Sequence, residues 1–111
     1  MQVDIYDGEE LMTIALKGDL DTSAAQDLDV QLEGLLSMVK GELVIDLGEL
    51  SYLNSTGIRS FIRLDKSLKP LGKRFRFVNA TPRILRIFQY CGLDRYFTFT
   101  PEPAAAGGAL V

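Results

Sequence analysis

The sequence predicts a single small α/β domain, with a mostly parallel sheet, an N-terminal hairpin and the element order β-β-α-β-α-β-α-β. Short apolar segments with strand-like alternation are separated by segments whose apolar residues recur at helical spacing, which favours βαβ units. The chain has 111 residues, enough for one hydrophobic core and too few for a second. We expect the domain over residues 1–100, and a flexible tail over residues 101–111, which are rich in Ala, Gly and Pro.

The first two strands are predicted to form the hairpin. Residues 3–6 and 11–17 each alternate apolar and polar side chains, and Asp7-Gly8 between them is a turn signal. Residues 18–21 are interpreted as a polar loop that leads into the first helix. Ser23 and Gln26 have the form of a capping box. Lys40-Gly41 is the predicted stop, and the predicted buried face holds Leu28, Leu32, Leu35, Leu36 and Val39.

The second half of the chain contains the predicted parallel strands. Residues 43–47 are almost continuously apolar, as in a strand that is buried on both faces. The second helix is predicted to start at Asn54-Ser55-Thr56-Gly57 and to end near Gly72, with a buried face of Ile58, Phe61, Ile62, Leu64, Leu68 and Leu71.

The last elements are a strand, a helix and a short strand. Residues 74–78 alternate as a strand, and Thr81-Pro82 supplies a helix cap with proline at the first helical position. This third helix is predicted to run to about Cys91, interpreted as a small buried residue at the helix end. Residues 96–99 are the predicted last strand.

Composition excludes several classes of function. The chain has no histidine and one cysteine, so we expect no metal site, no cofactor, no intrachain disulfide and a reducing cytoplasmic location. We expect neither export nor membrane insertion, because no basic segment leads into an apolar stretch near Met1 and no apolar run approaches a membrane span. A net charge of −3 argues against nucleic acid as a partner, because binding to phosphates depends on a surplus of Lys and Arg.

The charge is unevenly distributed along the chain. Residues 1–55 carry 12 acidic and 2 basic side chains, whereas residues 56–111 carry 3 acidic and 10 basic ones. The simpler interpretation is that the two halves present solvated faces that attract one another. The alternative is a polarised docking surface.

Motifs of catalysis are missing from the sequence. There is no phosphate-binding loop, no dinucleotide fingerprint and no nucleophile elbow. Asp19 and Asp21 are close in sequence, but separate solvation in a polar loop is a simpler interpretation than a catalytic pair. We therefore predict that the chain is not an enzyme. The alternative is a small enzyme or nucleotide-binding protein that uses the pocket at the carboxyl end of the sheet.

The segment Asp46–Arg59, with Asn54-Ser55-Thr56-Gly57 at its helix start, resembles the STAS domain of bacterial anti-sigma-factor antagonists. That family has a buried strand ending in Asp, a short loop, and Asp-Ser-Ser/Thr-Gly-Leu at a helix start. Gly18-Asp19-Leu20-Asp21 and Cys91-Gly92-Leu93 occupy the positions where the family carries similar sequences. The resemblance covers residues 3–99.

The resemblance implies a regulated binding protein. It makes Ser55 the residue phosphorylated by an anti-sigma factor that is also a serine kinase. The unphosphorylated chain would bind this partner, phosphorylation would release it, and a serine phosphatase would reset the switch. Asn54 stands where the family usually has Asp, and Thr56 is a less favoured acceptor. The predicted partner-binding residues are Asp19, Asp21, Asn54, Ser55, Thr56, Gly57 and Arg59.

Two other interpretations of these residues stay open. Taken without the flanking motifs, Ser55 and Asn54 are ordinary helix caps, a role that such residues often fill. Arg59, Asp19 and Asp21 are equally consistent with solvated surface charges. Within the same fold, the chain could also be a STAS subunit of a lipid-transport or sensory complex that phosphorylation does not regulate.

Overall fold

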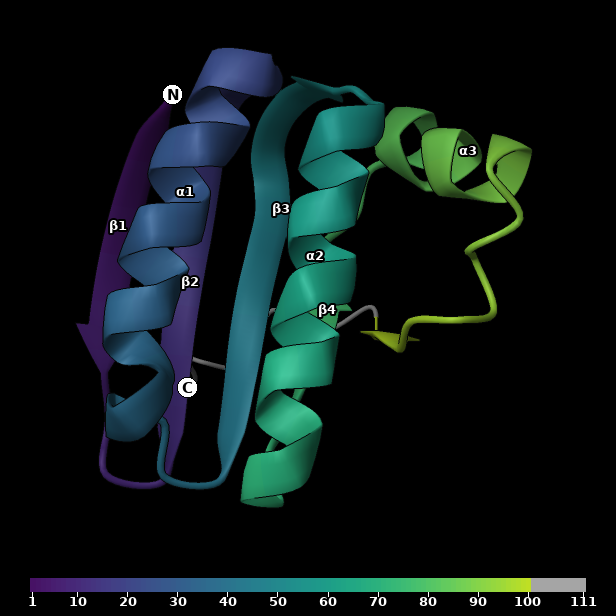
Figure 1. Cartoon of the computed structure of the whole chain (residues 1–111). Coiled ribbons are helices and arrows are strands. Elements are labelled where there is room, and N and C mark those ends of the chain that lie inside the picture. The colour runs from purple at the N-terminus through teal and green to yellow at the C-terminus, as the bar shows by residue number, and fades with distance from the viewer. Residues whose placement is uncertain (101–111) are drawn as a thin grey trace, which may run out of the picture.

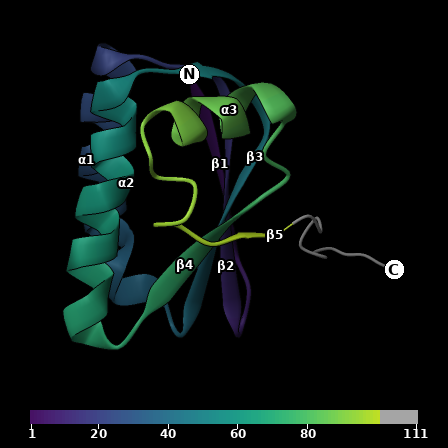
Figure 2. The same ribbon diagram turned by 90° about the vertical axis from the view of Figure 1, so that its right-hand side faces the viewer.

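A computed structural model describes residues 1–100, and the predicted tail at residues 101–111 lies outside the described residues. The helices α1 (Thr22–Leu35) and α2 (Ser55–Leu68) lie side by side over one face of a five-stranded sheet (Figures 1 and 2). The helix α3 (Pro82–Tyr90) contacts β3 near one end of the sheet (Figure 1).

The sheet has the strand order β1-β2-β3-β4-β5. The first pair is antiparallel and every other pair is parallel, which confirms the predicted fold class with its N-terminal hairpin. The strands are β1 (Gln2–Asp7), β2 (Leu11–Leu20), β3 (Glu42–Leu53), β4 (Arg74–Val78) and β5 (Phe99–Thr100).

The central strands are longer than the sequence predicted. β3 continues beyond residue 47 to Leu53, and residues 18–20, predicted as a loop, belong to β2. β4 pairs with β3 only as far as Asp46, so the rest of β3 pairs with β2 alone. Polar side chains can point to water along this two-stranded extension, which is why its sequence resembles a loop.

Two of the predicted helix ends were wrong. The Asp21 side chain, not Ser23, caps α1, accepting a hydrogen bond from the backbone N–H of Ala24 at 2.9 Å. α1 ends at Leu35 and is followed by a 3₁₀ turn over Leu36–Met38. Another 3₁₀ turn, Lys69–Leu71, follows α2 and leaves Leu71 exposed, although Leu71 was predicted to be buried.

The predicted start and end of α3 agree well with the structure. The Thr81 side chain caps α3 and Pro82 is its first residue. Gly92 follows α3 with φ +72°, the left-handed backbone that ends helices and favours glycine. The last strand is only Phe99–Thr100, shorter and later than predicted.

Aromatic packing joins α2 and α3 to the sheet. Phe77 of β4 is fully buried, and its ring centroid lies 4.9 Å from that of Phe61 in α2 and 5.4 Å from that of Phe88 in α3. Phe97 and Phe99 complete this cluster, with centroids 5.4 and 5.1 Å from Phe77. The pairs of Phe77 with Phe61 and with Phe97 are edge-to-face, and all of these rings except the half-buried Phe99 are buried. The cluster is therefore a large part of this small core.

The first turn of α2 lies close to the end of β2 at Gly57. A Cβ atom at this position would lie 2.8 Å from Leu20 Cγ and 3.1 Å from the Leu20 carbonyl oxygen. Leu20 is completely buried, so it has little room to move. Glycine therefore sets how closely the start of α2 approaches the sheet.

Gly57→Ala is expected to destabilise the fold by about 1–3 kcal/mol, because the added methyl group overpacks the contact with Leu20. Gly34→Ala is the matched control, since Gly34 lies in α1 and a Cβ there would meet nothing within 4 Å. That change should stabilise the fold by about 0.4–1 kcal/mol through helix propensity. Urea unfolding of both variants tests the contact, and equal effects would contradict it.

Candidate functional site

The site is built where β2 and β3 end side by side. Leu20 and Leu53 are register partners at the ends of these parallel strands, and the Asn54 backbone N–H donates to the Leu20 carbonyl oxygen at 3.3 Å. The next residues, Asp21 and Asn54, are the N-caps of α1 and α2. The two helix starts therefore lie next to each other at the carboxyl edge of the sheet.

A short chain of side-chain hydrogen bonds connects the two helix starts. Asn54 Oδ1 accepts from the Gly57 backbone N–H at 3.0 Å, which caps α2. Asn54 Nδ2 donates to Thr22 Oγ1 at 3.1 Å, and Thr22 Oγ1 donates in turn to Thr56 Oγ1 at 3.4 Å. The cap of α2 is thus tied to the first residue of α1.

Ser55 is the first residue of α2 and its side chain is exposed. Within residues 1–100 its hydroxyl makes no hydrogen bond, whereas the half-buried Thr56 is bonded to Thr22 and Gly57 is buried. Unpaired backbone N–H groups and the positive end of the helix dipole favour an anion at such a position. Ser55 is therefore the exposed hydroxyl of this segment.

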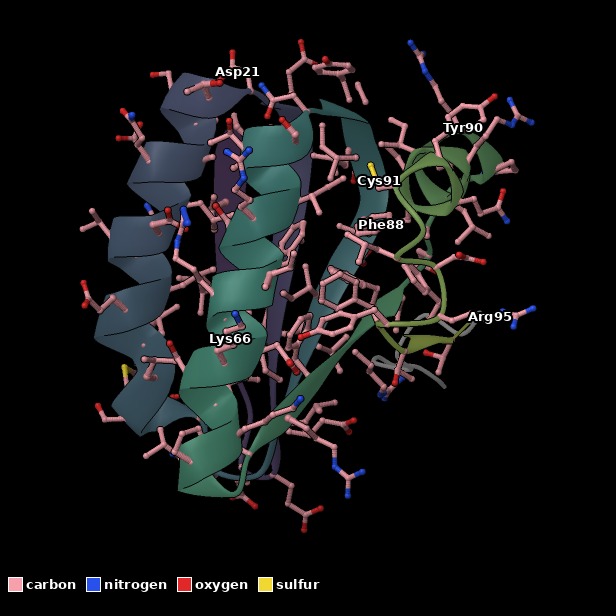
Figure 3. All side chains as sticks on the ribbon, turned by 45° about the vertical axis from the view of Figure 1, so that its right-hand side comes forward. Asp21, Lys66, Phe88, Tyr90, Cys91 and Arg95 are labelled. Atoms are coloured by element: carbon pink, nitrogen blue, oxygen red, sulfur yellow. The ribbon has the colours of Figure 1, made fainter. Side chains whose placement is uncertain are left out.

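A groove with carboxylates along it lies beside the start of α1, and residues of β1, β2 and α1 line it. Its volume is about 480 Å³, and Asp19, Asp21 and Asp27 line it together with apolar residues that include Val3 and Leu28. The three carboxylate residues are exposed, and Figure 3 shows Asp21 at the start of α1. Since Asp19 belongs to β2, the acidic residues are held by regular structure instead of a loop.

Comparisons with known proteins agree on the family to which this arrangement of strands and helices belongs. The protein-family model described as "Mlab, STAS domain" matches residues 6–101. This chain belongs to the STAS domain family. It is 33% identical over 83 residues to the anti-sigma-B factor antagonist of Listeria monocytogenes, with 73% of this chain and 71% of the relative covered. Its identity to the Bacillus subtilis anti-sigma-B factor antagonist is 29% over 93 residues, 84% of each chain.

Solved structures share the fold of this STAS domain. An anti-sigma factor antagonist from Mycobacterium paratuberculosis superposes with a TM-score of 0.83 at 23% identity, covering 95% of this chain and 89% of that one. SpoIIAA in its unphosphorylated form gives a TM-score of 0.73 at 18% identity, covering 95% and 91%. Phosphorylated SpoIIAA from Bacillus gives 0.72 at 20% identity, covering 95% and 96%.

The remaining predicted contact residue of the STAS domain, Arg59, is exposed one turn into α2 and makes no ion pair within residues 1–100. Its neighbour on the next turn, Arg63, binds Asp29 of α1 at 2.9 Å. The acidic and basic halves of the chain therefore do attract each other between α1 and α2, while Arg59 stays available to solvent.

Cys91 was predicted to be buried and is exposed. It follows the end of α3, next to Tyr90, which is 82% exposed (Figure 3). Phe88 supplies the buried side of this last turn, so the helix places Tyr90 and Cys91 on its outer side.

Groups with a shifted pKa lie away from the helix starts. Hydrogen bonds from Gln2 and then from Lys17 lower the pKa of the Asp4 carboxyl, and the same contact with Asp4 raises the pKa of Lys17. The hydrogen bond to Asp65 raises the pKa of Lys69 near the end of α2. These ion pairs belong to the hairpin and to the far end of α2.

Residues 1–100 contain neither a cluster of metal ligands nor a membrane-spanning helix. Among residues 1–100, no three His, Cys, Asp or Glu side chains are grouped so that they could hold a metal ion. None of the helices in that range is both long enough and apolar enough to cross a membrane.

Thr22 is a site residue that the sequence analysis missed. Its hydroxyl contacts Asn54 and Thr56, which are 32 and 34 positions away in the chain. No local pattern marks it, because the contact depends on the pairing of β2 with β3. A threonine directly after a capping Asp was the available signal.

Asn54→Ala is expected to destabilise the fold by about 1 kcal/mol, because the Gly57 N–H loses its cap. Asn54→Asp retains an oxygen for that N–H and places a negative charge at the positive end of the helix dipole. It should therefore lose clearly less stability than Asn54→Ala in urea unfolding. Equal losses would show that Asn54 does not act as a cap.

Proposed function

We propose that this STAS domain is an anti-sigma-factor antagonist that works by partner switching. The unphosphorylated chain binds an anti-sigma factor that is also a serine kinase, and phosphorylation of Ser55 releases it. A serine phosphatase restores the first state. The chain carries out no catalysis itself and acts in the cytoplasm of a bacterium, without binding nucleic acid or membrane, through residues 1–100.

The exposed hydroxyl of Ser55 at the start of α2 is the observation that carries this proposal. Its backbone is fixed by the neighbouring cap, while its oxygen has no partner within residues 1–100. In the reaction, the Ser55 oxygen bonds to the γ-phosphorus of ATP as the bond to the ADP oxygen breaks. The hydroxyl proton passes to a base of the kinase.

Energetics explain how one phosphate can control binding without unfolding the domain. Phosphorylation adds about −1.5 to −2 charges, and an exposed charge at a helix start is worth about 0.3–1 kcal/mol. At a docked interface, an unpaired or like-charged group costs about 2–5 kcal/mol, or roughly 30-fold to several thousand-fold in affinity. The modification therefore acts on the complex far more than on the fold.

The acidic groove beside the start of α1 is the proposed second contact surface. Asp19, Asp21 and Asp27 line it, and exposed Arg59 lies one turn along α2. A partner that places basic side chains opposite the groove would be attracted before phosphorylation. A phosphate at Ser55 would add negative charge at the neighbouring helix start and so change the charge that this partner meets.

Phosphate mapping tests the switch. The purified chain is incubated with ATP and each serine-kinase anti-sigma factor encoded in its own genome, and mass spectrometry locates the phosphate. We expect phosphate on Ser55 and none in Ser55→Ala. Ser55→Asp should bind the same partner about 30-fold or more weakly in calorimetry, because it places a negative charge in the interface.

Ser67→Asp is the matched control for Ser55→Asp. Ser67 is exposed on the same helix, about 18 Å further along its axis, so its charge should leave affinity nearly unchanged. Phosphate on another residue, or wild-type affinity in Ser55→Asp, would contradict the proposal. Stable binding to an ATPase with Ser55 unmodified would instead support a STAS subunit of a transport or sensory complex.

Neutralising the groove tests the contact surface. Asp19→Asn together with Asp21→Asn removes two charges, and Asn at position 21 can still cap α1. We expect affinity for the partner to fall about 3- to 20-fold, mainly through slower association at low salt. Glu9→Gln with Glu10→Gln, in the exposed turn at the other end of β2, should have no effect. An unchanged association rate in the first variant would exclude the groove.

A further inference from the structure

Within residues 1–100, Thr22 is the one residue of α1 whose side chain forms hydrogen bonds with residues 54–57. It accepts a hydrogen bond from Asn54 on one side of Ser55 and donates one to Thr56 on the other. The distances between the bonded atoms are 3.1 and 3.4 Å. Ser55 therefore lies between two residues that are both held by the same hydroxyl.

The directions of these hydrogen bonds follow from the chemistry of the groups. The Gly57 backbone N–H can only donate, so the carbonyl oxygen of the Asn54 amide must face it. The Asn54 NH₂ group must then face Thr22, whose oxygen accepts. The Thr22 proton is left free to point at Thr56. The bonds form one directional chain from Asn54 through Thr22 to Thr56.

We propose that Thr22 is a positioning residue for phosphorylation of Ser55, an inference that rests on the function proposed above. Helix ends are prone to fray, because their first backbone N–H groups lack partners within the helix. Thr22 ties the first turn of α2 to α1, so the Ser55 oxygen is presented to the kinase in one place. Correct placement of a reacting atom raises the rate at which the bound complex reacts. Thr22 itself exchanges no proton with Ser55 and no bond with the phosphate.

The asparagine at position 54 is part of the same arrangement. A carboxylate there has no N–H to donate, so the Thr22 proton would turn to it and leave Thr56. The amide can bind the Gly57 N–H and Thr22 at once while Thr22 still reaches Thr56. Asn54 and Thr22 act as a pair, although they are 32 residues apart.

Three variants separate positioning from general stability. Thr22→Val keeps the shape of the side chain and removes the hydroxyl, while Thr22→Ser keeps the hydroxyl. Ser37→Ala is the matched control, since Ser37 is exposed in the 3₁₀ turn that follows α1 and its hydroxyl makes no hydrogen bond within residues 1–100. Each full-length variant is incubated with ATP and the serine kinase that the phosphate mapping selects, and kcat and KM for the chain are measured.

Thr22→Val is expected to lower kcat about 3- to 10-fold, the usual range for the loss of one hydrogen bond, with a smaller change in KM. Thr22→Ser should restore kcat, and Ser37→Ala should match the wild type. In an Asn54→Ala background, Thr22→Val should cause a smaller loss than in the wild type, because the bond between the two residues is already missing and only the bond to Thr56 remains to be lost. A wild-type kcat in Thr22→Val, no rescue by serine, or additive effects would each overturn the inference.

A second measurement reads the hydrogen bond without the kinase. In NMR spectra of the unmodified chain, the side-chain NH₂ resonances of Asn54 should move in Thr22→Val and stay in place in Thr22→Ser. If Thr22→Val leaves these resonances unchanged, the hydrogen bond is absent. That result would overturn the inference and leave the proposed function untouched. Absence of phosphate on wild-type Ser55 would instead overturn the proposed function, and this inference with it.

Discussion

The pairing of β2 with β3 up to Leu20 and Leu53 is the constraint on which the rest of the site depends. Parallel strands that end opposite each other deliver the following residues to the same edge of the sheet. Here these residues are Asp21 and Asn54, and each caps the helix that follows it. A shift of one residue in this register would turn buried side chains to the other face and separate the two caps.

Apolar packing beneath the site brings the start of α2 close to the paired ends of β2 and β3. Leu20 fills the space under the first turn of α2, and Gly57 lets the helix approach it. The side chain of Asn54 then lies within reach of Thr22. The backbone around Ser55 is thus held from below by apolar contact and from the side by hydrogen bonds, while its hydroxyl faces outward.

Local pattern was enough to predict most of the fold. The hairpin alternation, the apolar strand that begins at residue 43, and the Thr81 cap are each decided by neighbours in sequence. Ser55 at a helix start was predicted in the same way. The resemblance to the STAS family was then confirmed by the family match over residues 6–101.

Tertiary contacts decided what the sequence could not predict. Asp21 and Ser23 both satisfy the rules for a helix cap, and only the end of the strand at Leu20 selects Asp21. The polar residues after position 47 look like a loop, because pairing with β2 cannot be read locally. The role of Thr22 depends on a residue 32 positions away.

The exposed residues at the edge of the site, Asp19 and Arg59, contribute little to the packing that stabilises the domain. Asp19 and Arg59 are exposed and make no side-chain hydrogen bond or ion pair within residues 1–100. Exposed positions of this kind usually accept substitution at little cost in stability. Related STAS domains can therefore diverge at these exposed positions while sharing the same fold. Such divergence would change which molecules the surface recognises at little cost in stability.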